Sequence, residues 1–144
     1  MTEQEIIAFV AGFDGVNVHT AAEGDGSPES AWGDSFFTVE GQRMPFATLV
    51  VSNYPGFDEA SDLDRDGVFR LNVGVGRERF TELLGYPPST PPEGIDYAVS
   101  DTLLPHPQYA TQAWVSIVCP GEPTSALARG LLQEAYHRAS GLGA

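Results

Sequence analysis

The first twenty residues carry the pattern of a capped helix followed by a strand. Thr2 and Glu5 have the spacing of a capping box, in which each side chain satisfies a backbone N–H at the start of a helix. The apolar residues that follow recur at helical spacing: Ile6, Phe9, Val10 and Phe13. Val16–Thr20 alternates apolar and polar residues, which is typical of a short strand. We therefore expect a helix from Thr2 to about Gly12 and then a strand.

The middle of the chain predicts three further strands. Asp34–Glu40, the turn 41–43 and Met44–Ser52 have the pattern of a β-hairpin, and the second of these strands is apolar on both faces. Val68–Val75 shows the clearest alternation in the chain. Its large apolar side chains point to one face: Phe69, Leu71, Val73 and Val75. The other face of this strand then carries polar side chains.

The second half of the chain places a helix, a strand and a helix around a long loop. A short helix is expected at Arg77–Leu84, because a glycine and two prolines follow it. Six of the eleven prolines lie between residues 87 and 107, so 86–112 is predicted to be a long loop. Loops of this length often act as lids or binding loops. Trp114–Cys119 predicts a strand, and Thr124–Ser140 predicts a final helix that ends at a glycine.

This order of elements favours one fold class. Consecutive strands joined by a hairpin favour an antiparallel sheet, and amphipathic helices need an apolar sheet face to cover. We expect an α+β protein built as a two-layer sandwich, with helices packed on one face of an antiparallel sheet. No internal repeat or shift in composition divides the chain, so residues 1–144 are expected to form a single domain.

Charge excludes several classes of function. The formal net charge is -13, and all seven basic residues are arginine. Nucleic acids and anionic membranes both require clustered positive charge, so neither is an expected partner. Without lysine the chain forms no Schiff base and no Walker-type phosphate loop, and no motif predicts a cofactor. The acidic excess favours a monomer or a weak dimer.

The sequence carries no pattern of export or membrane insertion. The residues after Met1 are acidic where a secretory signal is positive, and no apolar run approaches the ~18 residues of a membrane helix. A single cysteine, Cys119, precludes an intrachain disulfide. We therefore expect a cytoplasmic protein.

One acidic run matches the opening of a calcium-binding loop. Three alternating carboxylates precede Gly67: Asp62, Asp64 and Asp66. The position where such a loop needs a bidentate glutamate holds Val73 instead, and Arg65 interrupts the run. A solvated acidic turn is the favoured interpretation, and a weak calcium site is the alternative.

The polar side of Val68–Val75 is the best candidate for a binding face. Arg70 and Asn72 lie on it, and neighbouring strands can add an aromatic side chain from Phe36 or Trp114. An arginine among aromatic rings on an open sheet face suits a small anionic or planar ligand, or a protein partner. The alternative is that Arg70 pairs with an acid of the 58–66 loop as a surface salt bridge, which stabilises little.

A second hypothesis is a small enzyme that acts on an anionic metabolite. His106 stands between two prolines, and because an unperturbed histidine titrates near neutral pH, it is a candidate acid or base together with Asp34. Arg70 or Arg43 would hold the anion. This hypothesis requires His106, Asp34 and an arginine to line one pocket. The absence of a recognisable nucleophile, metal set or cofactor loop favours a non-catalytic binding or accessory module.

Several motifs resemble those of known families. They are AWGDSFF (31–37), RMPFAT (43–48), YPGF (54–57), SDLDR (61–65), GVFRLN (67–72), LLPHP (103–107) and WVS (114–116). Over nearly the whole chain they are similar to an uncharacterised actinobacterial family without an assigned activity. The order of strands and helices more distantly resembles the MmcQ/YjbR-like family. That resemblance implies an α+β fold with an antiparallel sheet, and its DNA-binding-like role is opposed here by the charge of -13.

Overall fold

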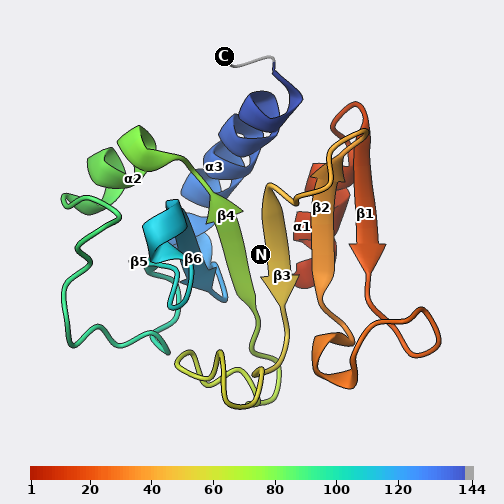
Figure 1. The fold of residues 1–144 in the computed structure, drawn as a ribbon, viewed down its shortest axis with the longest axis horizontal. Coiled ribbons are helices and arrows are strands. Elements are labelled where there is room, and N and C mark those ends of the chain that lie inside the picture. Colours follow the sequence, from red (N-terminus) through yellow and green to blue (C-terminus); the bar gives the residue numbers. More distant parts are fainter. Residues whose placement is uncertain (142–144) are drawn as a thin grey trace.

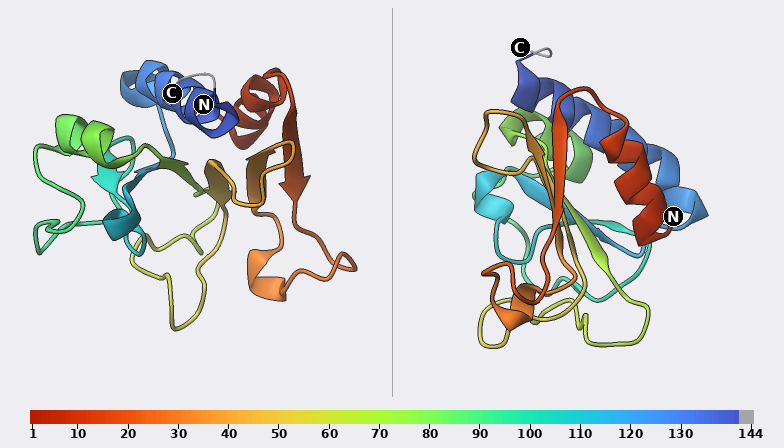
Figure 2. Two further views of the ribbon diagram at one scale, coloured as in Figure 1. Left: turned by 45° about the horizontal axis from the view of Figure 1, so that its top comes forward. Right: turned by 90° about the vertical axis from the view of Figure 1, so that its right-hand side faces the viewer.

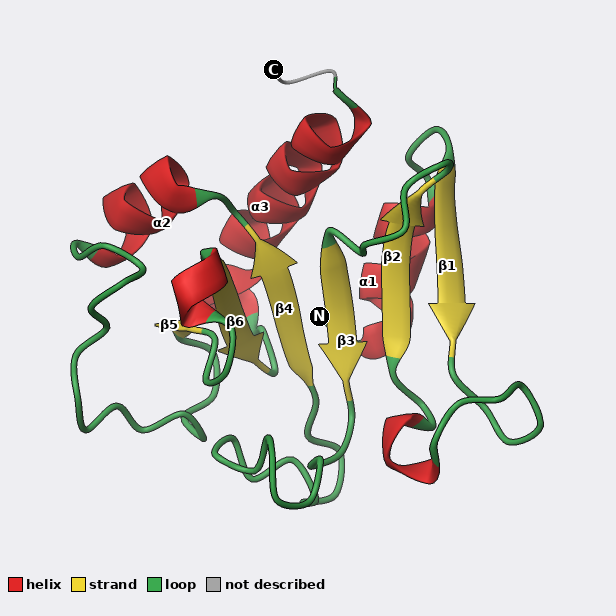
Figure 3. Cartoon of the chain, viewed as in Figure 1, coloured by secondary structure: helices red, strands yellow, loops and turns green. Residues whose placement is uncertain are grey.

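The computed structural model describes residues 1–141, which form one six-stranded sheet with three helices (Figures 1 and 3). The elements are α1 (Glu3–Ala11), β1 (Val16–Thr20), β2 (Ser35–Val39), β3 (Ala47–Val50), β4 (Arg70–Gly74), α2 (Arg77–Leu84), β5 (Leu103–Pro105), β6 (Trp114–Val118) and α3 (Glu122–Ser140). Two short 3-10 helices span Glu29–Ala31 and Ala110–Gln112. The strand order is β1-β2-β3-β4-β6-β5, and every neighbouring pair is antiparallel. The predicted α+β class with an antiparallel sheet is confirmed.

Helices α1 and α3 cover one face of the sheet. Figure 2 shows both helices on one side and the loops after β1 and β3 on the other. Helix α1 begins with the expected capping box between Thr2 and Glu5. The inner face of the central strands is fully apolar, and Leu71 of β4 and Leu49 of β3 are completely buried. They pack in one cluster with apolar side chains of both helices, among them Ile6 and Leu132.

Strand boundaries differ from the expected ones for local reasons. The strand predicted at Met44–Ser52 is shortened to Ala47–Val50, because Pro45 lacks an N–H and the Val51 N–H donates to the Asp34 side chain instead. Helix α3 begins two residues earlier than predicted, since Pro123 fits the first turn of a helix. Strand β5, with three residues, lies inside the proline-rich segment 86–112, where a long loop with at most short structure was expected.

The second face of the sheet is only partly open, which corrects the expectation of an open face. The chain between β3 and β4 folds across it and buries Asp58, Ser61 and Leu63 to within 5% of full burial. Beneath this loop, Arg70 and Asn72 are at most 1% exposed. None of the helices formed by residues 1–141 is long and apolar enough to cross a membrane.

Candidate functional site

A buried polar network lies on the second face of the sheet, centred on Arg70. Alternation in β4 directs Leu71 and Val73 to the helices, so Arg70 and Asn72 point to the opposite side. The Arg70 guanidinium donates to both carboxylate oxygens of Asp58, at 3.0 and 2.6 Å. It also donates to Ser61 Oγ at 2.9 Å, and Arg70 Nε donates to Asn72 Oδ1 at 2.8 Å. Its charge is therefore paired within the protein.

This pairing changes what Arg70 can do. It joins an acid of the 58–66 loop, as the alternative interpretation held, but the pair is buried and not at the surface: the side chains of Arg70 and Asp58 are 0% and 7% exposed. A bidentate carboxylate satisfies the fork of a guanidinium. Arg70 therefore ties the loop to the sheet and has little capacity left to hold an external anion.

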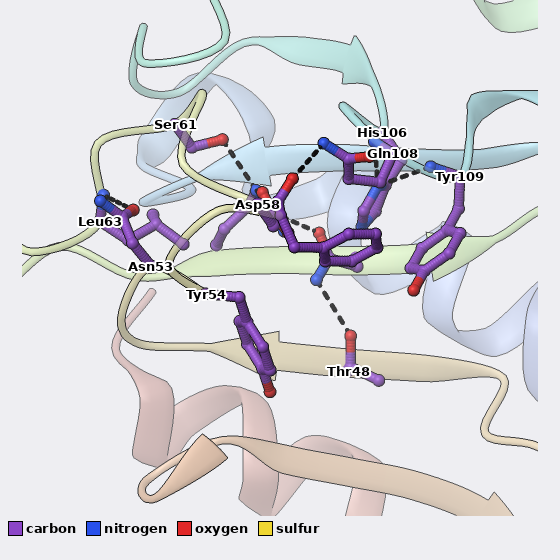
Figure 4. A network of polar contacts seen from close by, with 12 residues as sticks. Thr48, Asn53, Tyr54, Asp58, Ser61, Leu63, His106, Gln108 and Tyr109 are labelled. Carbon is purple, nitrogen blue, oxygen red and sulfur yellow. Dashed lines mark hydrogen bonds and ion pairs between the residues drawn. The ribbon is translucent and has the colours of Figure 1, made fainter. Parts of the chain in front are cut away.

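The network continues onto the neighbouring strand. Asn72 Nδ2 donates to Thr48 Oγ1 of β3 at 3.0 Å, and the two residues are register partners. Figure 4 shows Ser61 and Asp58 from the loop and Thr48 from β3 reaching the same network. Each side chain in this chain of contacts makes at least one hydrogen bond to another, which keeps the floor of the site rigid.

His106 joins the site from the edge of the sheet. It follows β5, its N–H donates to the Trp114 carbonyl, and its side chain is buried with 3% exposure. Two backbone N–H groups, those of Gln108 and Tyr109, donate to its Nδ1 atom, each at 3.0 Å. Because Nδ1 must supply the lone pair for both bonds, the neutral ring carries its proton on Nε2.

Electrostatics keep this ring neutral. The pKa of His106 is lowered to about 3, mainly by burial and also by the charge of Arg70, while Asp58 acts in the opposite direction. A protonated ring would also place an N–H against two backbone N–H donors. His106 is therefore a fixed hydrogen-bond donor at neutral pH. It has no lone pair available at Nε2 to take a proton, which opposes the hypothesis that it acts as a general base.

A cavity of about 330 Å³ opens over this floor. Five aromatic side chains line it: Phe36, Tyr54, Phe57, Tyr109 and Trp114. Arg70, Asn72, His106 and Thr48 form its polar side. Phe57 and Tyr109 stand at its mouth, 52% and 40% exposed, with ring centroids 6.1 Å apart. The size and the mixture of apolar walls with a few polar groups are those of a small-molecule pocket.

Asp34 lies behind this cavity and does not line it. The hydroxyl of Tyr54, a lining residue, donates to Asp34 Oδ2 at 2.5 Å, and the Val51 N–H donates to Oδ1 at 2.9 Å. Burial raises the pKa of Asp34 to about 6, and these two hydrogen bonds counteract the shift. Burial and the adjacent Asp34 raise the pKa of Tyr54. Asp34 therefore reaches the cavity only through Tyr54.

Other predicted site residues lie apart from the cavity. Arg43 is exposed in the turn between β2 and β3, whereas its neighbours Met44 and Pro45 line the wall. In the acidic run, Asp64 Oδ1 accepts the Asn53 N–H and Asp62 lies 3.4 Å from Arg65. Among residues 1–141, no group of three or more His, Cys, Asp or Glu is placed to hold a metal ion.

The site also contains residues that sequence reasoning did not single out. Tyr54, Phe57 and Asp58 come from the loop between β3 and β4, and Tyr109 comes from the end of the proline-rich segment. The only feature of the sequence that points to the three aromatic residues is the aromatic content of the two loops. Gln108 Nε2 donates to the Phe57 carbonyl at 2.6 Å and joins these loops at the cavity mouth. Only residues 106–112 of the proline-rich segment contribute to the cavity lining.

The fold and the site define an α+β protein with a half-covered sheet and one aromatic pocket on the side away from its helices. The chain belongs to a family of unknown function, DUF6194, whose family model matches residues 1–141. Comparison with curated proteins gives no match, and comparison with solved structures gives none either.

Proposed function

We propose that this protein is a non-catalytic binding module, a single cytoplasmic domain that takes a small planar ligand into the aromatic cavity. The observation that carries the proposal is the cavity itself. Five aromatic side chains surround a volume of about 330 Å³ over a floor whose one arginine is already neutralised. Flat rings stack favourably against such walls.

Of the two ligand classes expected from the sequence, the site favours the planar one. An anion needs an available positive charge, and the bidentate contact with Asp58 uses that of Arg70. Arg43 is exposed in a turn and lies outside the cavity lining. Moving a carboxylate or phosphate into this apolar space would cost free energy without compensation. The net charge of -13 adds long-range repulsion.

The enzyme hypothesis required His106, Asp34 and an arginine in one pocket. His106 and Arg70 line the same cavity, but Asp34 is separated from it by Tyr54. The lone pair of His106 that a base would use is held by two backbone N–H groups. The geometry gives the three residues positioning roles and supports binding in preference to proton transfer.

A thermal-shift screen of planar aromatic compounds tests the proposal. Tyr109→Ala and Phe57→Ala each remove one wall of the cavity mouth, and both side chains are exposed enough for the fold to tolerate the change. Val99→Ala is the matched control, because Val99 is 40% exposed and lies outside the cavity lining. We expect compounds that raise the Tm of the wild type and of Val99→Ala but shift the two mouth variants less. Equal shifts in all four proteins, or no active compound, would overturn it.

A further inference from the structure

The His106 ring in the cavity wall carries one polar atom that the protein leaves without a partner. His106 Nε2 makes no hydrogen bond within residues 1–141, although Nδ1 of the same ring makes two. No fully buried side-chain nitrogen or oxygen in this part of the chain lacks a partner. Nε2 must therefore be accessible, and the ring lines the cavity. A residue that is 97% buried and lines the cavity thus keeps one polar atom without a protein partner.

The direction of the hydrogen bond at this atom is fixed. Because the Gln108 and Tyr109 N–H groups both point at Nδ1, the proton of the neutral ring stands on Nε2. The ring cannot exchange the roles of its two nitrogens without losing both backbone contacts. A ligand group that meets Nε2 must therefore be a hydrogen-bond acceptor.

Other polar groups on the floor of the cavity also have hydrogen-bond donors to spare. Asn72 uses its oxygen for Arg70 and one N–H for Thr48, which leaves its second N–H. Thr48 Oγ1 accepts that bond, so its own O–H remains to donate. Each oxygen of Asp58 accepts a hydrogen bond from Arg70. The second N–H of Asn72 and the O–H of Thr48 are therefore donors that suit an acceptor oxygen.

We infer that the ligand is an uncharged, planar aromatic molecule bearing a carbonyl-type oxygen, and that His106 Nε2–H is the group that binds this oxygen. The inference rests on the proposed function and specifies its ligand class. The aromatic walls account for the planar body, the donors of the floor account for the acceptor, and the paired Arg70 accounts for the lack of charge.

Three probes of similar shape test the inference: 2-acetylnaphthalene, 2-isopropylnaphthalene and 2-naphthoate. The ketone carries the acceptor, the hydrocarbon replaces it with a methyl group, and the acid carries a charge. We expect the wild type to bind the ketone about fivefold more tightly than the hydrocarbon, the gain of one net hydrogen bond, and the naphthoate most weakly. Titration calorimetry or tryptophan fluorescence measures the three dissociation constants.

The substitution His106→Asn removes the Nε2–H donor and keeps an acceptor for the two backbone N–H groups. Asparagine Oδ1 can take the place of Nδ1 and accept the two backbone N–H groups, while the Nε2–H is lost and the shorter side chain keeps its own N–H groups back from the position of Nε2. The ketone should then lose its advantage over the hydrocarbon. The ¹⁵N spectrum of the wild-type imidazole gives a readout independent of the variant: the Nε2–H tautomer is expected, with a resonance that shifts on addition of the ketone and not of the hydrocarbon.

The outcomes distinguish the two proposals. Equal affinity for ketone and hydrocarbon, or a preference for naphthoate, with binding still weakened by Tyr109→Ala, would overturn the ligand class and leave the pocket standing. An imidazole proton on Nδ1 would overturn the ligand class as well. If no probe binds, or if Tyr109→Ala binds all three like the wild type, the proposed function itself fails.

Discussion

Arg70 Nη2 lies 2.6 Å from Asp58 Oδ2, and this pair closes the loop between β3 and β4 onto the centre of the sheet. The loop carries Tyr54 and Phe57, two of the aromatic walls of the cavity. The buried pair therefore does two things at once: it removes the charge of the arginine from the floor, and it holds the wall in place.

Asp58→Asn should destabilise the protein strongly. It leaves the Arg70 guanidinium buried without a counter-charge, and breaking a buried pair in this way costs about 3 to 5 kcal/mol. Urea unfolding measures the loss. Asp62→Asn is the control, because its pair with Arg65 is exposed and its removal should cost less than about 1 kcal/mol. Similar losses of unfolding free energy in the two variants would show that the Asp58–Arg70 pair does not hold the loop in place.

Asp34 should make the folded protein less stable as the pH rises. Its pKa of about 6 in the fold lies above the ordinary value of 3.8, so the folded state holds the proton more tightly than the unfolded state. The stabilising effect is complete below pH 3.8 and is lost as the pH rises through 6. Between these values the wild type should lose up to about 1.4 kcal/mol per pH unit relative to Asp34→Asn. If the free energies of unfolding of the wild type and Asp34→Asn change with pH in parallel, the raised pKa of Asp34 is contradicted.

His106 should act in the opposite direction. Its pKa of about 3 in the fold lies below the ordinary value of 6.5, so the unfolded state takes up a proton first as the pH falls. The stability that the neutral ring contributes is complete above pH 6.5 and is lost as the pH falls through 3. His106→Asn should remove this acid sensitivity. Denaturant midpoints measured from pH 3 to pH 7 give the comparison, and an unchanged acid slope in the variant would refute it.

The sequence contained enough local information to predict most of the fold. The capping box at Thr2 placed α1, and the alternation of Val68–Val75 placed Arg70 and Asn72 on the side away from the helices. Strand β5 could not be predicted, because it has three residues, ends at a proline and forms by pairing with β6. Local pattern carries no information about such a tertiary contact.

The site was predicted only in part, for the same reason. His106, Arg70, Asn72 and Trp114 were expected to matter and do line one cavity. That Asp58 neutralises Arg70 depends on how a loop folds across the sheet. That the His106 ring becomes a donor depends on two backbone N–H groups turning toward it. Arg43, expected to hold a ligand, is exposed in a turn outside the cavity lining.

The two tryptophans provide the most direct test of the central claim. Trp114 lines the cavity, whereas the Trp32 indole N–H donates to the Ser27 carbonyl at 3.2 Å and its residue lies outside the cavity lining. In a ¹H–¹⁵N titration with 2-acetylnaphthalene, we predict that the Trp114 indole resonance shifts to saturation while that of Trp32 stays in place. A shift of both resonances alike, or of neither, would contradict a planar ligand bound in this cavity.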